Sequence, residues 1–126
     1  MIAVDTSVWI EFLRGREPFF SRLRGLLEEG EVLAPECVFG ELLQGAKDVK
    51  EEGLISAYWN SMPKLPVEEP FIQAGIQSFR HQWLSRGIGL VDGLLIVFAR
   101  ASSSRIWTLD KKLLAILEPS EGYEIA

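Results

Sequence analysis

Short apolar runs alternate along the chain with longer stretches in which apolar residues recur at helical spacing. Three runs, at 2–4 (IAV), 31–34 (EVLA) and 105–109 (RIWTL), are typical of short buried strands. The segment 64–68 (KLPVE), between prolines, is a weaker strand candidate, and 123–125 (YEI) is a candidate edge strand. Strands that alternate with helical segments imply a parallel sheet covered by helices. The pattern therefore predicts a mainly parallel sheet of four to five strands.

The stretches between these runs carry helix signals. The predicted helices cover about 8–14, 18–30, 35–46, 48–60, 70–87, 90–101 and 111–118. Thr6 or Ser7 is the expected cap of the first helix. The run at 90–101 is apolar enough for a buried strand, but its length and the Asp near its start favour a helix.

The helix expected from Pro70 has the clearest periodicity of the chain. Ile72, Ile76, Phe79 and Trp83 recur at positions i, i+4, i+7 and i+11. This spacing is typical of an amphipathic helix whose apolar face packs on a core.

Strands that alternate with helices predict an α/β fold in three layers, with a parallel sheet between helices. We find no repeat, linker or low-complexity tract, so residues 1–126 are expected to form a single domain.

Composition narrows the function classes. The 126 residues are 48% hydrophobic, which is enough for a core, and no apolar run reaches the length of a membrane span. One cysteine and one histidine exclude a disulfide framework and a cysteine-based zinc site. Residues 1–15 lack the features of a signal peptide, so we expect a cytoplasmic protein without a membrane partner.

Two acids follow predicted strands directly. Asp5 comes after IAV and Asp110 after RIWTL, and parallel strands deliver both to the same edge of the sheet. If the strands are neighbours, two carboxylates about 5 Å apart repel each other by roughly 3 kcal/mol at an effective dielectric constant near 20. Such a pair calls for a bound cation or a retained proton. Each acid on its own also fits a helix cap.

Two further acids interrupt apolar segments. Glu41 is a charge in the mostly apolar or small run CVFGELLQGA, and Asp92 stands among Leu90, Val91 and Leu94. An ionised carboxylate buried there without a partner would be costly. Glu41 as a solvated helix residue and Asp92 as a cap remain alternatives, but four such acids together fit one metal site better than four separate roles.

Four segments resemble, in order and spacing, the motifs of PIN-domain ribonucleases, and most closely those of VapC-like toxins of type II toxin–antitoxin pairs. They are VDTSVWIEFLRG, FGELLQGA, LVDGLLIVFARA and IWTLD, which together extend over nearly the whole chain. The resemblance implies a Rossmann-like α/β/α sandwich, a single PIN-like nuclease domain, that binds Mg²⁺ or Mn²⁺ and cleaves RNA. It also implies a homodimer and a small antitoxin partner that blocks the acidic cleft.

Carried over by position, the implied metal-binding and catalytic residues are Asp5, Glu41, Asp92 and Asp110. Ser7 or Thr6, together with Thr108, matches the hydroxyl positions beside the first and last acids. The sequence departs from the pattern in two places. LLIVFA follows Gly93 where the family commonly has small residues, and lysines follow Asp110 where a fifth acid would stand.

The acidic composition, with a net charge of −5, opposes nucleic-acid binding unless metal offsets the carboxylates. Arg14, Arg16 and Lys47 are therefore candidates for holding the phosphates that flank the cleaved bond. A water activated by the metal would attack the phosphorus and leave a 5′-phosphate and a 3′-hydroxyl.

Two other classes of function compete with the nuclease. One is a PIN-like module that binds RNA or protein without cutting it, against which the four acids argue. The other is a small metal-dependent phosphatase, in which Asp5 would accept a phosphoryl group. That class expects a second aspartate two positions later, where Ser7 stands.

Overall fold

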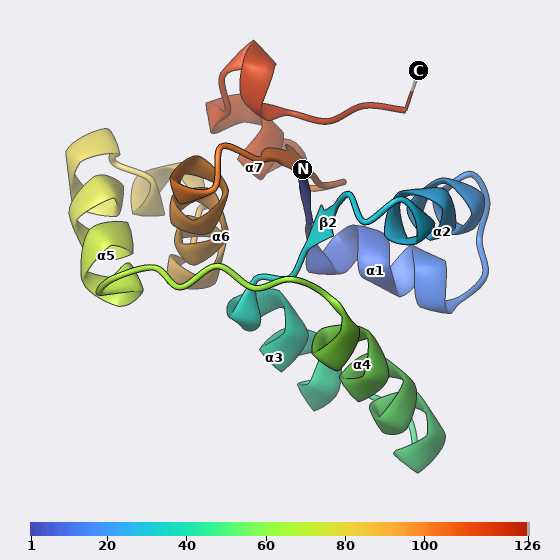
Figure 1. Ribbon diagram of the computed structural model, residues 1–126. Coiled ribbons are helices and arrows are strands. Elements are labelled where there is room, and N and C mark those ends of the chain that lie inside the picture. The colour runs from blue at the N-terminus through green and yellow to red at the C-terminus, as the bar shows by residue number, and fades with distance from the viewer. Residues whose placement is uncertain (126) are drawn as a thin grey trace.

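The computed structural model describes residues 1–125. The strands are β1 (Ile2–Val4), β2 (Val32–Leu33) and β3 (Arg105–Trp107). The α-helices are α1 (Thr6–Leu13), α2 (Phe19–Glu28), α3 (Glu36–Gln44), α4 (Val49–Ser61), α5 (Pro70–His81), α6 (Leu90–Ala101) and α7 (Lys111–Ile116). Two short 3₁₀ helices, η1 (Leu84–Arg86) and η2 (Pro119–Glu121), complete the set (Figure 1).

The sheet is parallel, with the order β2-β1-β3. Ile2 lies opposite Val32 and Arg105, so the apolar β1 is the central strand, and each of its residues is buried. The neighbouring helices cover the sheet, and α6 contacts both β1 and β3. The predicted α/β fold with a parallel sheet is confirmed.

The predicted number of strands is wrong, because the described residues contain three strands rather than four or five. Segment 64–68 has no ladder, and prolines, which lack an N–H donor, stand at 63 and 66. Near the C-terminal end, pairing is limited to a bridge between Ile106 and Gly122, so 123–125 is not a strand.

The start of α1 and the end of α5 differ from the predicted helix bounds. The helix α1 begins at Thr6, because the carboxylate of Asp5 accepts a hydrogen bond from the Thr6 backbone N–H. Asp5, and not Thr6 or Ser7, is therefore the cap. The helix α5 ends at His81, because Gln82 adopts a left-handed backbone conformation with φ of 53°.

The helix α5 is amphipathic as predicted, but its apolar face points to solvent. The exposed fractions of Ile72, Ile76 and Phe79 are 60%, 44% and 86%, whereas Trp83, beyond the helix, is 3% exposed. Ala74, on the opposite side of α5, is fully buried in a cluster with two residues of α6, Leu94 and Val97. The periodicity identified the helix but not the side that packs.

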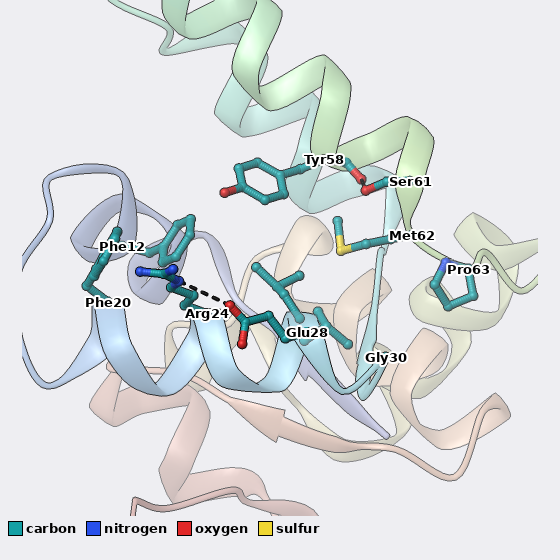
Figure 2. A pocket seen from close by; sticks show the side chains of 11 residues that line it. Phe12, Phe20, Arg24, Glu28, Gly30, Tyr58, Ser61, Met62 and Pro63 are labelled. Atoms are coloured by element: carbon teal, nitrogen blue, oxygen red, sulfur yellow. Dashed lines mark hydrogen bonds and ion pairs between the residues drawn. The ribbon is translucent and has the colours of Figure 1, made fainter.

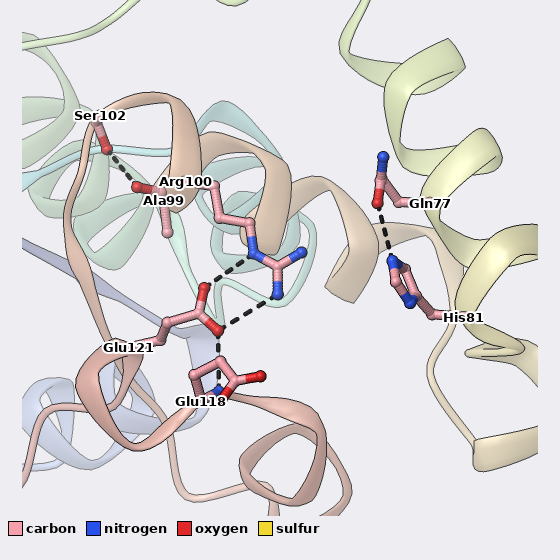
Figure 3. Close-up of polar contacts among 7 residues, drawn as sticks. All are labelled: Gln77, His81, Ala99, Arg100, Ser102, Glu118 and Glu121. Atoms are coloured by element: carbon pink, nitrogen blue, oxygen red, sulfur yellow. Dashed lines mark hydrogen bonds and ion pairs between the residues drawn. The ribbon is translucent and has the colours of Figure 1, made fainter.

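The helix α6 is the buried helix of the domain. Its residues from Gly93 to Ala99 are all buried, which confirms the helical interpretation of this apolar run. At its end, Arg100 forms a two-pronged ion pair with Glu121 of η2, at 2.8 and 3.3 Å (Figure 3). Within residues 1–125 no helix is long and apolar enough to cross a bilayer.

Candidate functional site

Asp5 is a buried carboxylate at the carboxyl end of the central strand. Its side chain is 7% exposed, and it accepts three hydrogen bonds. The Thr6 backbone N–H donates to Oδ1 at 2.8 Å, and the hydroxyls of Ser7 and Thr108 donate to Oδ2 at 3.0 and 2.7 Å. These donors compensate the burial of the carboxylate and fix its orientation.

The Asp5 and Asp110 segments are tied together, as adjacent parallel strands require. Thr108, 4% exposed at the end of β3, donates to Asp5 and accepts from the Asp110 backbone N–H at 3.0 Å. The Leu109 backbone N–H donates to the Ser7 hydroxyl at 3.1 Å. The structure thus brings both strand-end acids and both predicted hydroxyl residues to one edge of the sheet.

Asp110 is also the cap of α7. Its Oδ1 accepts from the backbone N–H groups of Lys112 and Leu113, at 2.8 and 3.4 Å. A capping carboxylate of this kind is held in place by the first turn of its helix. The sequence analysis treated a helix cap and a metal-site residue as alternative roles for Asp5 and Asp110. The structure shows that each of these acids can cap a helix and still face the shared edge of the sheet.

Glu41 is joined to the site by a hydroxyl. The Thr6 side chain donates to Glu41 Oε1 at 2.8 Å, so the first turn of α1 holds a residue of α3. Glu41 is exposed, and α1 and α3 pack against each other. Thr6 and Ser7 therefore have separate roles: Thr6 positions Glu41, whereas Ser7 positions Asp5.

Asp92 shows that the four acids share one electrostatic environment. Partial burial raises the pKa of Asp92 from 3.8 to about 6, and the negative charges of Asp5, Asp110 and Glu41, in that order, add to the increase. The Gly89 backbone partly offsets these effects. Three acids from three other segments thus lie close enough to repel a carboxylate in the first turn of α6.

The negative charge of the site suits a bound cation, but the carboxylates do not converge into a complete coordination shell. Among residues 1–125, no Lys, Arg, His or N-terminal nitrogen lies within 4.0 Å of these four carboxylates. In the same residues, no three His, Cys, Asp or Glu side chains converge closely enough to surround a metal ion. Hard carboxylate donors fit Mg²⁺ or Mn²⁺, and Mg²⁺ usually keeps several waters and needs only one or two direct carboxylates. The donor set therefore fits a hydrated divalent ion.

The predicted phosphate-binding residues lie outside this cluster. Arg14 and Arg16 pair with Glu11, at 3.9 and 3.2 Å, at the far end of α1. The nine residues from Asp5 to Arg14 correspond to roughly 13 Å along a helix. Lys47, beyond the end of α3, pairs with Glu51 at 3.9 Å. The structure does not bring these three cations together with the acids.

Lys112, whose backbone N–H donates to Asp110, was not among the predicted phosphate-binding residues. The side chain of Lys112 follows the Asp110 cap and lies against Gly87, whose φ is +82°. A Cβ at Gly87 would come within 2.8 Å of Lys112 Cδ, so this glycine leaves room for the lysine. The two lysines directly after Asp110 were the available sequence signal.

The lone thiol has the character of a packing residue. Burial raises the pKa of the Cys37 thiol to about 11, and the charges of Glu41 and Asp5 contribute to the increase. A thiol so rarely ionised near neutral pH is a poor nucleophile.

The surface also has two hollows, and none of the four acids lines either of them. One, of about 450 Å³, lies between α2 and the end of α4, next to β2; Phe12, Arg24, Tyr58 and Met62 are among its lining residues (Figure 2). The other, of about 820 Å³, lies between α3, the 63–70 loop and α6. We therefore identify the candidate site by its four acidic side chains and not by the volume of a hollow.

A protein-family model described as "PIN domain" matches residues 2–117. The chain belongs to the PIN-domain family. The chain is also 35% identical over 116 residues to Ribonuclease VapC32 of Mycobacterium tuberculosis, a match that covers 91% of this chain and 89% of the relative. The resemblance to VapC-like PIN-domain ribonucleases is thereby confirmed.

Solved structures share the PIN fold of this chain. VapBC2 from Rickettsia felis, bound to a DNA fragment from its promoter, gives a TM-score of 0.68 at 18% identity, over 98% of each chain. FitAcB from Neisseria gonorrhoeae gives a TM-score of 0.63 at 21% identity, over 91% of each chain. At these identities the comparisons establish the fold.

Proposed function

We propose that this PIN-domain protein is a metal-dependent endoribonuclease and the toxin of a toxin–antitoxin pair. The observation that carries the proposal is that the charges of Asp5, Asp110 and Glu41 act on Asp92. Among residues 1–125 no basic nitrogen lies within 4.0 Å of any of these four carboxylates. The 35% identity to a protein named as a ribonuclease supports RNA as the substrate.

In this proposal Asp5, Asp92 and Glu41 hold Mg²⁺ or Mn²⁺, directly or through water, and Asp110 orients a water or a second ion. When bound, the metal supplies Lewis-acid chemistry, which acidifies water and offsets charge on the phosphate. Thr108 and Ser7 keep Asp5 oriented, and Thr6 holds Glu41, so the ligands are arranged before metal and RNA arrive.

The proposed donor set leads to a prediction of the products. A metal held by these carboxylates would acidify a bound water, so we propose that water rather than the ribose 2′-hydroxyl is the attacking group. Cleavage then leaves a 5′-phosphate and a 3′-hydroxyl. Arg14, Arg16 and Lys47 remain proposed contacts for phosphates farther along the RNA, beyond the acidic edge.

The proposed partners are RNA, an antitoxin and a second copy of the chain. The structural similarity to VapBC2 and FitAcB supports a toxin–antitoxin assembly. With a net charge of −5, the chain favours an antitoxin that presents a basic side chain to the acidic site.

The test is cleavage of a mixed pool of structured RNAs in Mg²⁺, in Mn²⁺ and in EDTA. We expect metal-dependent cutting that Asp92→Asn abolishes. Asp48→Asn is the matched control, because Asp48 only caps α4 through the Glu51 N–H, and Asn caps equally well. Cutting in EDTA, or full activity in Asp92→Asn, would contradict the proposal. Metal binding without cutting would favour the non-catalytic binding module.

A further inference from the structure

Lys112 is a cation that the candidate site does not yet account for. Its backbone N–H donates to Asp110 Oδ1 at 2.8 Å, and its side chain extends from there to Gly87. Gly87 lies five residues before Asp92, in the segment that leads into α6. The Lys112 side chain therefore connects the two chain segments that carry Asp110 and Asp92.

Gly87 gives the Lys112 side chain its place. The φ of Gly87 is +82°, and a Cβ there would lie 2.8 Å from Lys112 Cδ and 3.4 Å from both Cε and Nζ. Only glycine combines this backbone conformation with room for the passing side chain. Long cationic side chains commonly lay their aliphatic stems on a surface in this way while the charged end stays in water.

The amine of Lys112 is not neutralised by an acid. Within residues 1–125 no carboxylate oxygen lies within 4.0 Å of Lys112 Nζ, and the residue is exposed. Arg14, Arg16 and Lys47, by contrast, each pair with a glutamate. Those pairs reduce the charge that the three cations offer to RNA, whereas Lys112 keeps its full charge.

We propose that Lys112 binds the RNA phosphate next to the cleaved bond. The inference rests on the proposed nuclease function, because it assigns a substrate contact to the same site. In that function the cleaved phosphate lies at the metal that the four acids hold. Lys112 Nζ lies against Gly87 and more than 4.0 Å from each of those carboxylates, so it is offset toward the adjacent phosphate. A lysine amine binds phosphate as a compact point charge.

This contact answers the electrostatic problem of an acidic nuclease. The chain has a net charge of −5, and a metal offsets the acids only at the place where they hold it. The phosphates on either side of the cleaved bond then face a negative surface, which opposes binding. A lysine that follows Asp110 directly offsets one such phosphate without taking a place among the metal ligands.

The salt dependence of RNA binding tests the contact without cleavage. Fluorescence anisotropy of a labelled single-stranded RNA, in EDTA and over a range of KCl concentrations, gives the slope of log K against log salt. We expect Lys112→Gln to weaken binding at low salt by about fivefold. The magnitude of the slope is expected to fall by about 0.7, the value for one phosphate of a single strand. Lys112→Arg keeps the charge and is expected to keep the slope.

Lys50→Gln is the matched control, because it changes the net charge by the same amount. Lys50 is exposed, has no ion-pair partner within residues 1–125 and lies on α4, which Figure 1 shows well apart from α7. An unchanged slope in Lys112→Gln, an equal loss in Lys50→Gln, or no RNA binding by wild type would overturn the proposal. A reduced slope in a protein that does not cut RNA would uphold Lys112 as a phosphate contact while the nuclease proposal failed.

Steady-state cleavage in Mn²⁺ separates the adjacent phosphate from the cleaved one. A contact made equally in the ground state and in the transition state changes KM and leaves kcat unchanged. We therefore expect Lys112→Gln to raise KM about fivefold at constant kcat, and Lys50→Gln to change neither. A fall in kcat at constant KM would place Lys112 at the reacting phosphate and contradict the proposal.

Gly87→Ala tests whether this glycine positions the lysine. The added methyl group displaces the Lys112 stem, so we expect the variant to lose RNA affinity as Lys112→Gln does. The double variant is then expected to lose no more than either single variant, because both changes remove the same contact. Circular dichroism checks that each variant is folded. Additive losses would show that Gly87 does not position Lys112.

Discussion

At the scale of single residues, hydroxyl groups set the geometry of the candidate site. Thr108 has both hydrogen-bonding capacities engaged: it donates to Asp5 and accepts from the Asp110 N–H. Thr6 performs the corresponding task for Glu41. The acids are therefore oriented by neutral donors, which leave the negative charge of the cluster available to a cation.

We predict that Thr108→Val destabilises the domain by about 1–3 kcal/mol, because the buried Asp5 carboxylate loses one of its three donors and the Asp110 N–H loses its acceptor. Thr108→Ser keeps the hydroxyl and is the control. Urea unfolding followed by tryptophan fluorescence measures the difference. Equal stability of the Val and Ser variants would show that the hydroxyl does not support Asp5.

The sequence predicted for a physical reason that these acids lie near one another. Asp5 and Asp110 each follow an apolar strand, and parallel strands necessarily deliver such residues to one edge. Glu41 and Asp92 stood out as charges in apolar surroundings. The Thr6–Glu41 hydrogen bond joins residues 35 positions apart, and only packing of α1 on α3 creates it.

At the scale of elements, α6 connects the site with the C-terminal end of the domain. It carries Asp92 in its first turn and Arg100 in its last, where the ion pair with Glu121 secures η2 (Figure 3). The Arg100 hydrogen bond is the main reason that the pKa of Glu121 is lowered from 4.5. This attachment is therefore sensitive to acid.

We predict that Glu121→Gln lowers the free energy of unfolding by about 0.5–1 kcal/mol at neutral pH, the range of a partly exposed ion pair. Because folding lowers the pKa of Glu121, the stabilisation by this ion pair is complete above pH 4.5. It is lost as the pH falls through the pKa of Glu121 in the folded protein. Urea unfolding of both proteins across this range measures it. A difference that grows in acid would contradict the assignment, and Glu124→Gln, an exposed acid nearby, is the control.

Element prediction failed where local pattern and tertiary context disagree. The segment 64–68 was a weak strand candidate, but Pro66 lacks an N–H donor and the segment forms no ladder. For α5 the period was correct and the orientation wrong, because periodicity locates an apolar face without saying what covers it.

At the scale of the whole molecule, the domain places four carboxylates from distant segments around one edge of a three-stranded parallel sheet. Without metal this arrangement opposes folding. The raised pKa of Asp92 means that its ionisation weakens the folded state as the pH rises from 3.8 to about 6, and the full cost applies at neutral pH. Under the proposed metal site, a bound divalent cation would reverse that cost, because it would favour the charged form.

The most direct test of the metal-site account is thermal unfolding at neutral pH of wild type, Asp92→Asn and the control Asp48→Asn, each in EDTA and in Mn²⁺. In EDTA we expect the free energy of unfolding of Asp92→Asn to exceed that of wild type by about 1 kcal/mol. This value is reduced for the solvent exposure of the Asp92 side chain. In Mn²⁺ we expect wild type and Asp48→Asn to gain stability and Asp92→Asn to gain little, so that the order reverses. Equal stabilisation of all three proteins by Mn²⁺, or of none, would contradict a shared metal site at these carboxylates.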